Sequence, residues 1–234
     1  MSNDKNVFNL NNGFTDLWTS VLTPLNADFS IDTNKYVIHV KTLLSNGSKG
    51  VCIFDQYGEG PSFSLQERKA LLDELIKAEI PSNSILVCTT AASIKDMTEL
   101  TQHAVAHKVI GCLMGTPFYY AKSSNQGLID SYADVINAVL EKNWFIYLHN
   151  NPFVVSGTLP HAVITELLRL FPNHISGVLD ASENLTTSSE LVRSFFANCM
   201  VYTQHEKDIM KVIELKSAGA VSVVANLLPK QVSK

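Results

Sequence analysis

Eight short apolar segments recur along the chain, and amphipathic helical patterns separate them. The segments are rich in Val, Ile, Leu, Phe and Tyr, and their apolar character is nearly continuous. Such runs are typical of strands buried on both faces of a parallel sheet, because helices cover each face. The segments are residues 18–25, 50–55, 85–90, 111–116, 144–150, 176–182, 199–204 and 220–226.

The stretches between these segments carry apolar residues at the spacing of a helix. The clearest stripe lies in residues 125–143, where apolar side chains recur three or four positions apart, and residues 33–44 and 64–78 repeat the pattern. Eight strands that alternate with seven helices predict an α/β chain folded as a (β/α)8 TIM barrel. An open doubly wound sheet is the less favoured alternative.

Only the sequence LLPKQVSK follows the last predicted strand, so we expect no eighth helix. The predicted domains are a polar, Asn-rich extension at residues 1–16 and a TIM-barrel domain at residues 17–234. A barrel that lacks its last helix exposes apolar strand surface. The candidates to cover that surface are a partner chain, residues beyond this sequence, and the extension with its Phe8, Leu10 and Phe14.

The composition indicates a globular chain without a nucleic-acid partner. Hydrophobic residues make up 46% of the 234 residues and charged residues 17%, which are the proportions of a folded domain. The net charge of −4 lacks the basic excess that nucleic acid demands. No apolar run is long enough to span a bilayer and none resembles a signal peptide, so we expect a soluble, cytoplasmic protein with no membrane partner. The four cysteines lie in apolar runs without CxxC spacing and are expected to be reduced core thiols.

Polar side chains follow the predicted strands at their C-terminal ends, the face of a TIM barrel that carries its chemistry. They are hydroxyls, carboxylates, carboxamides and imidazoles, and no lysine or arginine lies within any of the eight predicted strands. The residues include Thr23, Asp55, Gln56, Tyr57, Glu59, Thr89, Thr90, Thr116, Tyr119, His149, Asn150, Asp180, Ser182, Gln204, His205 and Asn226.

Six segments carry motifs in a fixed order: VLTPLNADFSIDTNKY, YGEGPSFSLQER, GTPFYYAKSSNQGL, YLHNNPFVVSG, SGVLDASENL and AVSVVANLLP. Together they resemble the dihydrodipicolinate synthase and N-acetylneuraminate lyase family of pyruvate-dependent aldolases. The resemblance extends over residues 17–229 and implies a TIM barrel. It also implies a C-terminal helical domain, which we do not expect within residues 1–234.

The resemblance implies a Schiff base between a lysine on the sixth strand and a 2-oxo acid, usually pyruvate. The family pattern at that strand places Leu179 at the lysine position, and leucine can neither attack a carbonyl nor hold a proton. His149 stands where the family has a proton-relaying tyrosine; it could exchange a proton near neutral pH or only hydrogen-bond to a neighbouring backbone group. Tyr147 shares its parity and is expected in the core. Tyr119 matches a tyrosine that in the synthases reaches into a neighbouring subunit's site.

The implied ligand-binding positions have also diverged. Gln56 and Tyr57 replace two threonines that hold the substrate carboxylate in the family, and Val154 and Val155 occupy the stretch where synthases carry an arginine. Pyruvate binding in the family mode therefore loses its covalent anchor and most of its charge complementarity. The predicted substrate-binding positions are Gln56, Tyr57, Gly58, Glu59, Asn150, Asp180 and Asn226, and the last of these matches a structural asparagine of the family.

Three functional interpretations follow. The favoured one is a divergent lyase-family member whose pyruvate aldolase or synthase activity is impaired or lost, including a non-catalytic small-molecule binder or a partner of an intact relative. The second is repurposed chemistry, either acid–base or through a divalent metal on Asp55, His149, Asp180 and His205. The third is ordinary aldolase activity through another lysine, for which the nearest are Lys122 and Lys207.

The favoured interpretation includes no cofactor and no bound metal. It does include a small-molecule ligand, for which a 2-oxo acid is one candidate, and assembly as a homo-oligomer.

Overall fold

A computed structural model describes residues 16–119, 123–154 and 158–232 of the chain. All eight predicted strands are present, and each overlaps its apolar segment. Most strands end before their segments do, because the last residues of those segments turn out of the sheet, whereas β5 begins two residues after its segment and ends with it. The strands are β1 (Asp16–Ser20), β2 (Gly50–Ile53), β3 (Ile85–Cys88), β4 (Gly111–Gly115), β5 (Ile146–Asn150), β6 (Ile175–Asp180), β7 (Met200–Thr203) and β8 (Gly219–Ser222).

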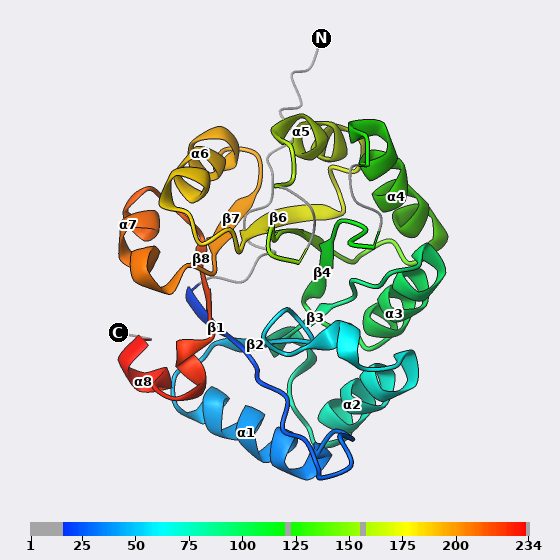
Figure 1. The fold of residues 1–234 in the computed structure, drawn as a ribbon, viewed down its shortest axis with the longest axis vertical. Helices are drawn as coiled ribbons and strands as arrows, with labels where there is room; N and C mark the ends of the chain where they lie inside the picture. The colour runs from blue at the N-terminus through cyan, green and yellow to red at the C-terminus, as the bar shows by residue number, and fades with distance from the viewer. Residues whose placement is uncertain (1–15, 120–122, 155–157, 233–234) are drawn as a thin grey trace.

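These strands form a closed parallel barrel in sequence order, in which β8 pairs back onto β1 (Figure 1). The strands occupy the centre of the molecule and the helices surround them. Because all strands run in one direction, their C-terminal ends meet on a single face. The predicted (β/α)8 TIM barrel is confirmed.

Each strand is followed by a helix on the outside of the barrel, and most helices begin at a capping side chain. In α2, Ser64 and Glu67 form a capping box, while Ser93 caps the first turn of α3. The long helices are α1 (Thr33–Ser45), α2 (Leu65–Lys77), α3 (Ile94–Ala106), α4 (Asn125–Ala138), α5 (His161–Leu170), α6 (Leu185–Phe195) and the shorter α7 (Ile209–Glu214).

One further helical turn, α8 (Pro229–Val232), follows β8. The expectation of no eighth helix is therefore corrected to a helix of 4 residues. This turn is too short to cover a barrel side as α1 to α7 do, and Leu227 and Leu228 before it remain exposed. The predicted extension at residues 1–16 falls on residues 1–15, outside the described part, except that β1 already begins at Asp16.

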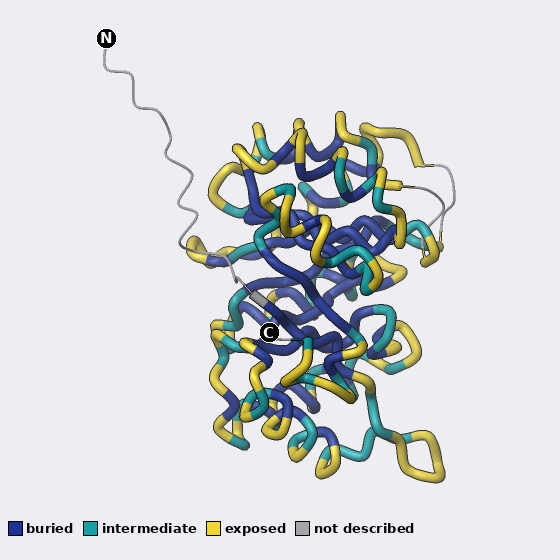
Figure 2. The backbone as a smooth tube through the Cα atoms, turned by 90° about the vertical axis from the view of Figure 1, so that its left-hand side faces the viewer, coloured by how far each residue is buried: buried dark blue, intermediate teal, exposed yellow. Residues whose placement is uncertain are grey.

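Two tyrosines fill the centre of the barrel. The rings of Tyr147 on β5 and Tyr202 on β7 meet edge to face with centroids 5.7 Å apart, and both residues are fully buried. Gly111 on β4 and Gly177 on β6 make room for them, because an added Cβ at Gly111 would lie 2.6 Å from the Tyr147 ring. In Figure 2 the backbone of the inner part of the molecule is dark blue, which marks buried residues.

The four cysteines are buried and unpaired, as predicted. Burial raises the pKa of each thiol, so the protonated and unreactive form prevails at neutral pH. Within the described residues, no helix combines the length and apolar character needed to cross a membrane.

Candidate functional site

A cavity of about 220 Å³ opens at the C-terminal face of the barrel. The loops after β2, β3 and β5 and the end of β4 form its walls. This volume suits a molecule of few heavy atoms, since sites for drug-sized ligands are larger. The lining residues are Phe54, Asp55, Gln56, Glu59, Pro61, Ser62, Cys88, Thr90, Gly115, His149, Asn151 and Val154.

Asp55 lines this cavity and is held in place by hydrogen bonds. Its carboxylate accepts hydrogen bonds from Ser20 Oγ at 2.6 Å, from Gln204 Nε2 at 2.7 Å and from the Gly58 amide at 3.1 Å. Burial raises the pKa of Asp55, while these three donors act in the opposite direction. The carboxylate thereby joins the ends of β1, β2 and β7 in one network.

His149 also lines the cavity and is almost completely buried. Burial lowers its pKa to about 4, although a hydrogen bond with Gln204 favours the charged form. Its Nε2 atom has no hydrogen-bond partner among the described residues. The imidazole is therefore neutral at pH 7 and has one ring nitrogen available to a ligand.

Leu179 lies next to His149 in the barrel but is sealed from the cavity. In the strand register it pairs with His149 on one side and Tyr202 on the other. Alternate residues of a strand share a face, so Leu179 points inward together with Gly177. The side chain is fully buried and does not contribute to the cavity wall.

The loop after β2 divides its predicted binding residues between cavity and scaffold. Gln56 and Glu59 line the cavity, and the Gln56 Oε1 atom accepts a hydrogen bond from Asn151. Tyr57 does not line it; its hydroxyl donates to Glu183 at 3.3 Å. Gly58 is a structural residue, because its amide donates to Asp55 and an added Cβ would lie 2.9 Å from the Val21 carbonyl oxygen.

Close backbone packing in this loop predicts that Gly60→Ala lowers the free energy of unfolding by about 2–3 kcal/mol. An added Cβ would lie 2.1 Å from the Phe54 carbonyl oxygen, and Phe54 itself is held at a φ of 63°. Urea denaturation measures the loss. Gly127→Ala in α4 is the matched control, because its added Cβ meets only Ser124 Oγ at 3.4 Å and alanine favours a helix. Equal stabilities of the two variants would contradict this reason.

Asn150 and Asp180, both predicted to bind substrate, lie in the scaffold behind the cavity. Asp180 points toward α6, where its carboxylate accepts hydrogen bonds from Ser182 and Ser188, and Asn150 Nδ2 donates to it at 2.6 Å. Burial raises the pKa of Asp180 against these donors. Asn151, the next residue, enters the cavity instead. Asn151 and not Asn150 therefore lines the cavity, because the end of β5 alternates its side chains between the two faces.

Arg68 is a buried residue that the sequence interpretation missed. It is 4% exposed, and its guanidinium donates to the carbonyl oxygens of Cys88 and Thr90 at 2.6 and 3.0 Å. The side chain also covers the Phe54 ring at 5.4 Å. Arg68 thus holds the backbone of two residues that line the cavity without lining it itself.

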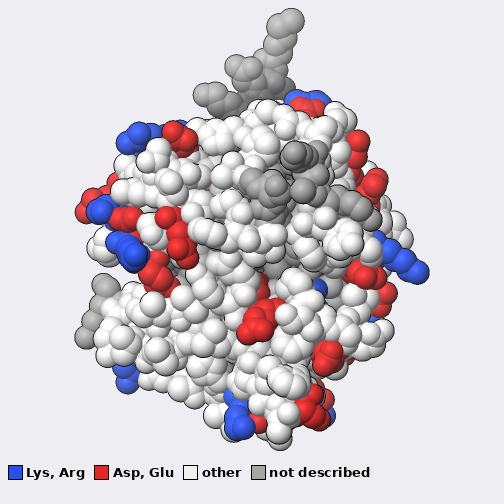
Figure 3. All heavy atoms as spheres, in the orientation of Figure 1, with Lys and Arg blue, Asp and Glu red and all other residues white. Residues whose placement is uncertain are grey.

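The charge at the cavity is acidic. Among the described residues, Asp55 and Glu59 line it and no lysine or arginine does. Figure 3 shows acidic atoms near the centre of this face, whereas most lysine and arginine atoms lie toward its rim. An anionic ligand would therefore lack a direct cationic partner here.

A model of the dihydrodipicolinate synthetase family matches residues 13–234. The chain belongs to this family. The 4-hydroxy-tetrahydrodipicolinate synthase of Methanococcus maripaludis strain C6 is 27% identical over 215 residues, which are 92% of this chain and 72% of that enzyme. The synthase of Methanocaldococcus jannaschii is 26% identical over 220 residues, which are 93% of this chain and 73% of that enzyme.

Solved structures of the dihydrodipicolinate synthetase family share the barrel. Dihydrodipicolinate synthase from Agrobacterium tumefaciens superposes with a TM-score of 0.90 at 28% identity, covering 94% of this chain and 76% of that one. A prophage protein of the family from Escherichia coli K12, solved in complex with pyruvate, gives a TM-score of 0.84 at 23% identity, covering 93% and 72%. At this identity the second likeness shows the fold alone.

Two further residues implied by the dihydrodipicolinate synthetase family lie away from the cavity. Tyr119 follows β4 and is 73% exposed on this chain. Asn226 makes four hydrogen bonds: it donates to Ser20 and Val223 and accepts from His39 and the Leu22 amide. These bonds tie the end of β8 to β1 and α1, so Asn226 has a structural role.

The alternative metal site of Asp55, His149, Asp180 and His205 is not assembled. Asp180 points toward α6, and His205 contacts Asp208 at 3.1 Å. Among the described residues, the only His, Cys, Asp and Glu cluster with metal-binding spacing lies elsewhere in the fold. Of the two lysines considered as substitute nucleophiles, Lys207 is exposed on the 3-10 helix η4 (Glu206–Asp208), and Lys122 lies outside the described residues.

Proposed function

We propose that this member of the family has impaired or no pyruvate aldolase or synthase activity through a Schiff base. The burial of Leu179 in the sixth strand carries the proposal, because the family resemblance places the lysine nucleophile there. An imine requires an amine that can attack the keto carbon, and an isobutyl group supplies none. No lysine lines the cavity within the described residues to take its place.

The cavity nevertheless supports a small-molecule ligand. Its lining combines apolar surface with a few converging polar groups, which is the usual composition of a binding site. Asp55 disfavours a 2-oxo acid, the ligand class that the resemblance implies, because its carboxylate would repel that of the ligand. We therefore propose an uncharged or cationic small ligand, bound through His149, Asn151 and Gln56.

Sodium borohydride reduction in the presence of pyruvate tests the loss of the Schiff base. We expect the intact mass of the protein to stay unchanged, because no amine is placed to form the imine that borohydride reduces. An intact aldolase of the family, treated in parallel, should gain one reduced pyruvate adduct. A single adduct on this chain, located by peptide mapping to one lysine, would overturn the proposal.

A second candidate function is acid–base catalysis without a lysine. The His149 imidazole has a free Nε2 atom at the cavity and interacts with Gln204, which in turn donates to Asp55. With a pKa of about 4 this imidazole is a weak base, so it suits the removal of a proton from an acidic group of a bound ligand. With a substrate in hand, His149→Gln should abolish turnover, while ligand binding is weakened but retained through Asn151 and Gln56.

We also propose a cytoplasmic protein that assembles with copies of itself. Several large apolar side chains are exposed on and beside the side of the barrel near α1 and α8, and association would remove them from water. They include Leu22, Ile38, Leu227 and Leu228.

A further inference from the structure

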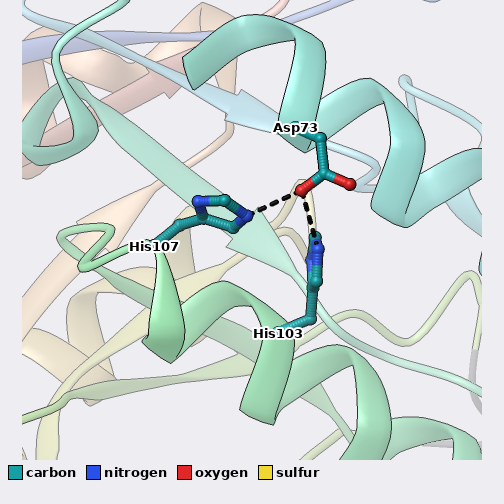
Figure 4. A group of neighbouring side chains, drawn as sticks. All are labelled: Asp73, His103 and His107. Carbon is teal, nitrogen blue, oxygen red and sulfur yellow. Dashed lines mark hydrogen bonds and ion pairs between the residues drawn. The ribbon is translucent and has the colours of Figure 1, made fainter. Parts of the chain in front are cut away.

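Three side chains outside the cavity converge between α2 and α3 (Figure 4). The Nε2 atoms of His103 and His107 lie 2.9 and 2.7 Å from the same Asp73 oxygen, Oδ1. All three candidate ligand atoms lie within 4.8 Å of one another. Neither the cavity nor its supporting network uses any of these residues.

The two helices hold this cluster in a fixed register. His103 lies in the last turn of α3 and His107 is the C-cap residue four positions later, with helical backbone angles, so the two side chains lie on one face of the helix. One turn closer to the helix starts, Lys69 of α2 pairs with Glu99 of α3 at 2.9 Å, which aligns the same two faces. Both helices begin at side-chain caps. The ligand atoms are thus positioned by rigid elements, which reduces the ordering that an ion would otherwise impose.

Two imidazole nitrogens and one carboxylate oxygen form a donor set that Zn²⁺ prefers. A tetrahedral zinc ion holds its ligand atoms about 3.3 Å apart, so small side-chain rotations from the present distances would admit it. The Nε2 protons would leave or move to Nδ1, and zinc would replace the two contacts to Asp73. Asp73 is half exposed, so solvent can deliver the ion and a water molecule can complete its coordination.

We propose that Asp73, His103 and His107 form a zinc site that links α2 to α3. The site lies toward the ends of these helices, at the opposite end of the barrel from the cavity, because the helices run back from the C-terminal face. A bound ion would stabilise the folded chain without entering the ligand pocket. The proposal does not depend on the function proposed above.

Isothermal titration of ZnCl₂ into tag-free protein, stripped of metal with a chelator, tests the site. We expect one ion per chain with a micromolar dissociation constant. At a hundredfold excess of zinc over this constant, the melting temperature should rise by roughly 5 °C or more. Co²⁺ should give the visible absorption bands of a four-coordinate ion.

His103→Gln and His107→Gln should each weaken zinc binding about tenfold or more, and Asp73→Asn should weaken it as well. His161→Gln, an exposed histidine at the start of α5, is the matched control and should bind zinc as the parent does. Melting curves without metal show whether each variant folds. No zinc uptake by the parent chain, or equal uptake by the folded His103→Gln and His161→Gln variants, would overturn the site.

Discussion

Replacing Leu179 by lysine is expected to lower the free energy of unfolding at pH 7 by about 3–5 kcal/mol. The position is fully buried and faces the barrel centre between His149 and Tyr202. A lysine ammonium there loses its hydration without gaining a carboxylate partner, since Asp180 points to the opposite face. Urea denaturation of parent and variant measures the difference.

The loss should depend on pH in a defined direction. Burial would depress the pKa of the introduced amine in the folded state below its unfolded value of about 10.4. Between those two values the unfolded chain binds more protons, so the stability of the variant rises with pH. Leu179→Met is the matched control, with a loss below about 1.5 kcal/mol that does not change with pH. A small, pH-independent loss in the lysine variant would show that the barrel centre is wetter than its packing indicates.

The same variant also tests whether the cavity admits a 2-oxo acid. If Leu179→Lys is trapped by borohydride with pyruvate, the cavity still admits a 2-oxo acid and lacks only the amine. An unmodified variant that is folded would indicate that pyruvate does not reach the introduced amine, either because the acidic lining disfavours it or because position 179 stays sealed from the cavity.

Lowering the pH from 6.5 to 4 is expected to reduce the contribution of His149 to stability by about 3 kcal/mol. Burial depresses the folded-state pKa of His149 to about 4, whereas the pKa of an unfolded histidine is about 6.5. In this window the unfolded chain binds the proton and the folded chain does not, so stability falls as the pH falls. The stability that neutral His149 gives is fully present above pH 6.5.

His149→Gln isolates this contribution. Buried Asp55 and Asp180 have raised pKa values and act in the opposite direction, because the folded chain binds their protons first as the pH falls. The two carboxyl groups remain in the variant, so the difference between parent and variant reports the imidazole. Urea denaturation at several pH values should show the parent losing more stability toward pH 4. Parallel curves would mean that His149 titrates normally and is open to water.

The barrel could be predicted from the sequence because both the apolar strand segments and the helical repeat of apolar residues between them are clear. Strands buried on both faces leave continuous apolar runs, and α4 shows a clear helical stripe. The sequence predicts the ends of the helices and strands less accurately than their order. It does not predict α8, because 4 residues are too few to show a helical repeat.

The roles of the predicted site residues stay predictions, but the structure shows which of these residues line the cavity. The alternation of side chains along a strand decides which residues face the cavity. Leu179 faces inward, so Asp180 must face outward. By the same alternation, Asn151 lines the cavity and Asn150 does not. Arg68 carried a signal as well, since it falls on the buried stripe with Leu71, Leu72 and Leu75 of α2. His103 and His107 have helical ligand spacing, but Asp73 comes from another helix, so only the fold brings the three together.

The closed ring of eight hydrogen-bonded strands has a consequence for recognition. Every strand already has two neighbours, so no edge is free to take up an extended peptide or the strand of another molecule. A partner of this protein must therefore bind to its outer helices or to its loops. Side-chain chemistry, and not backbone pairing, will decide its partners.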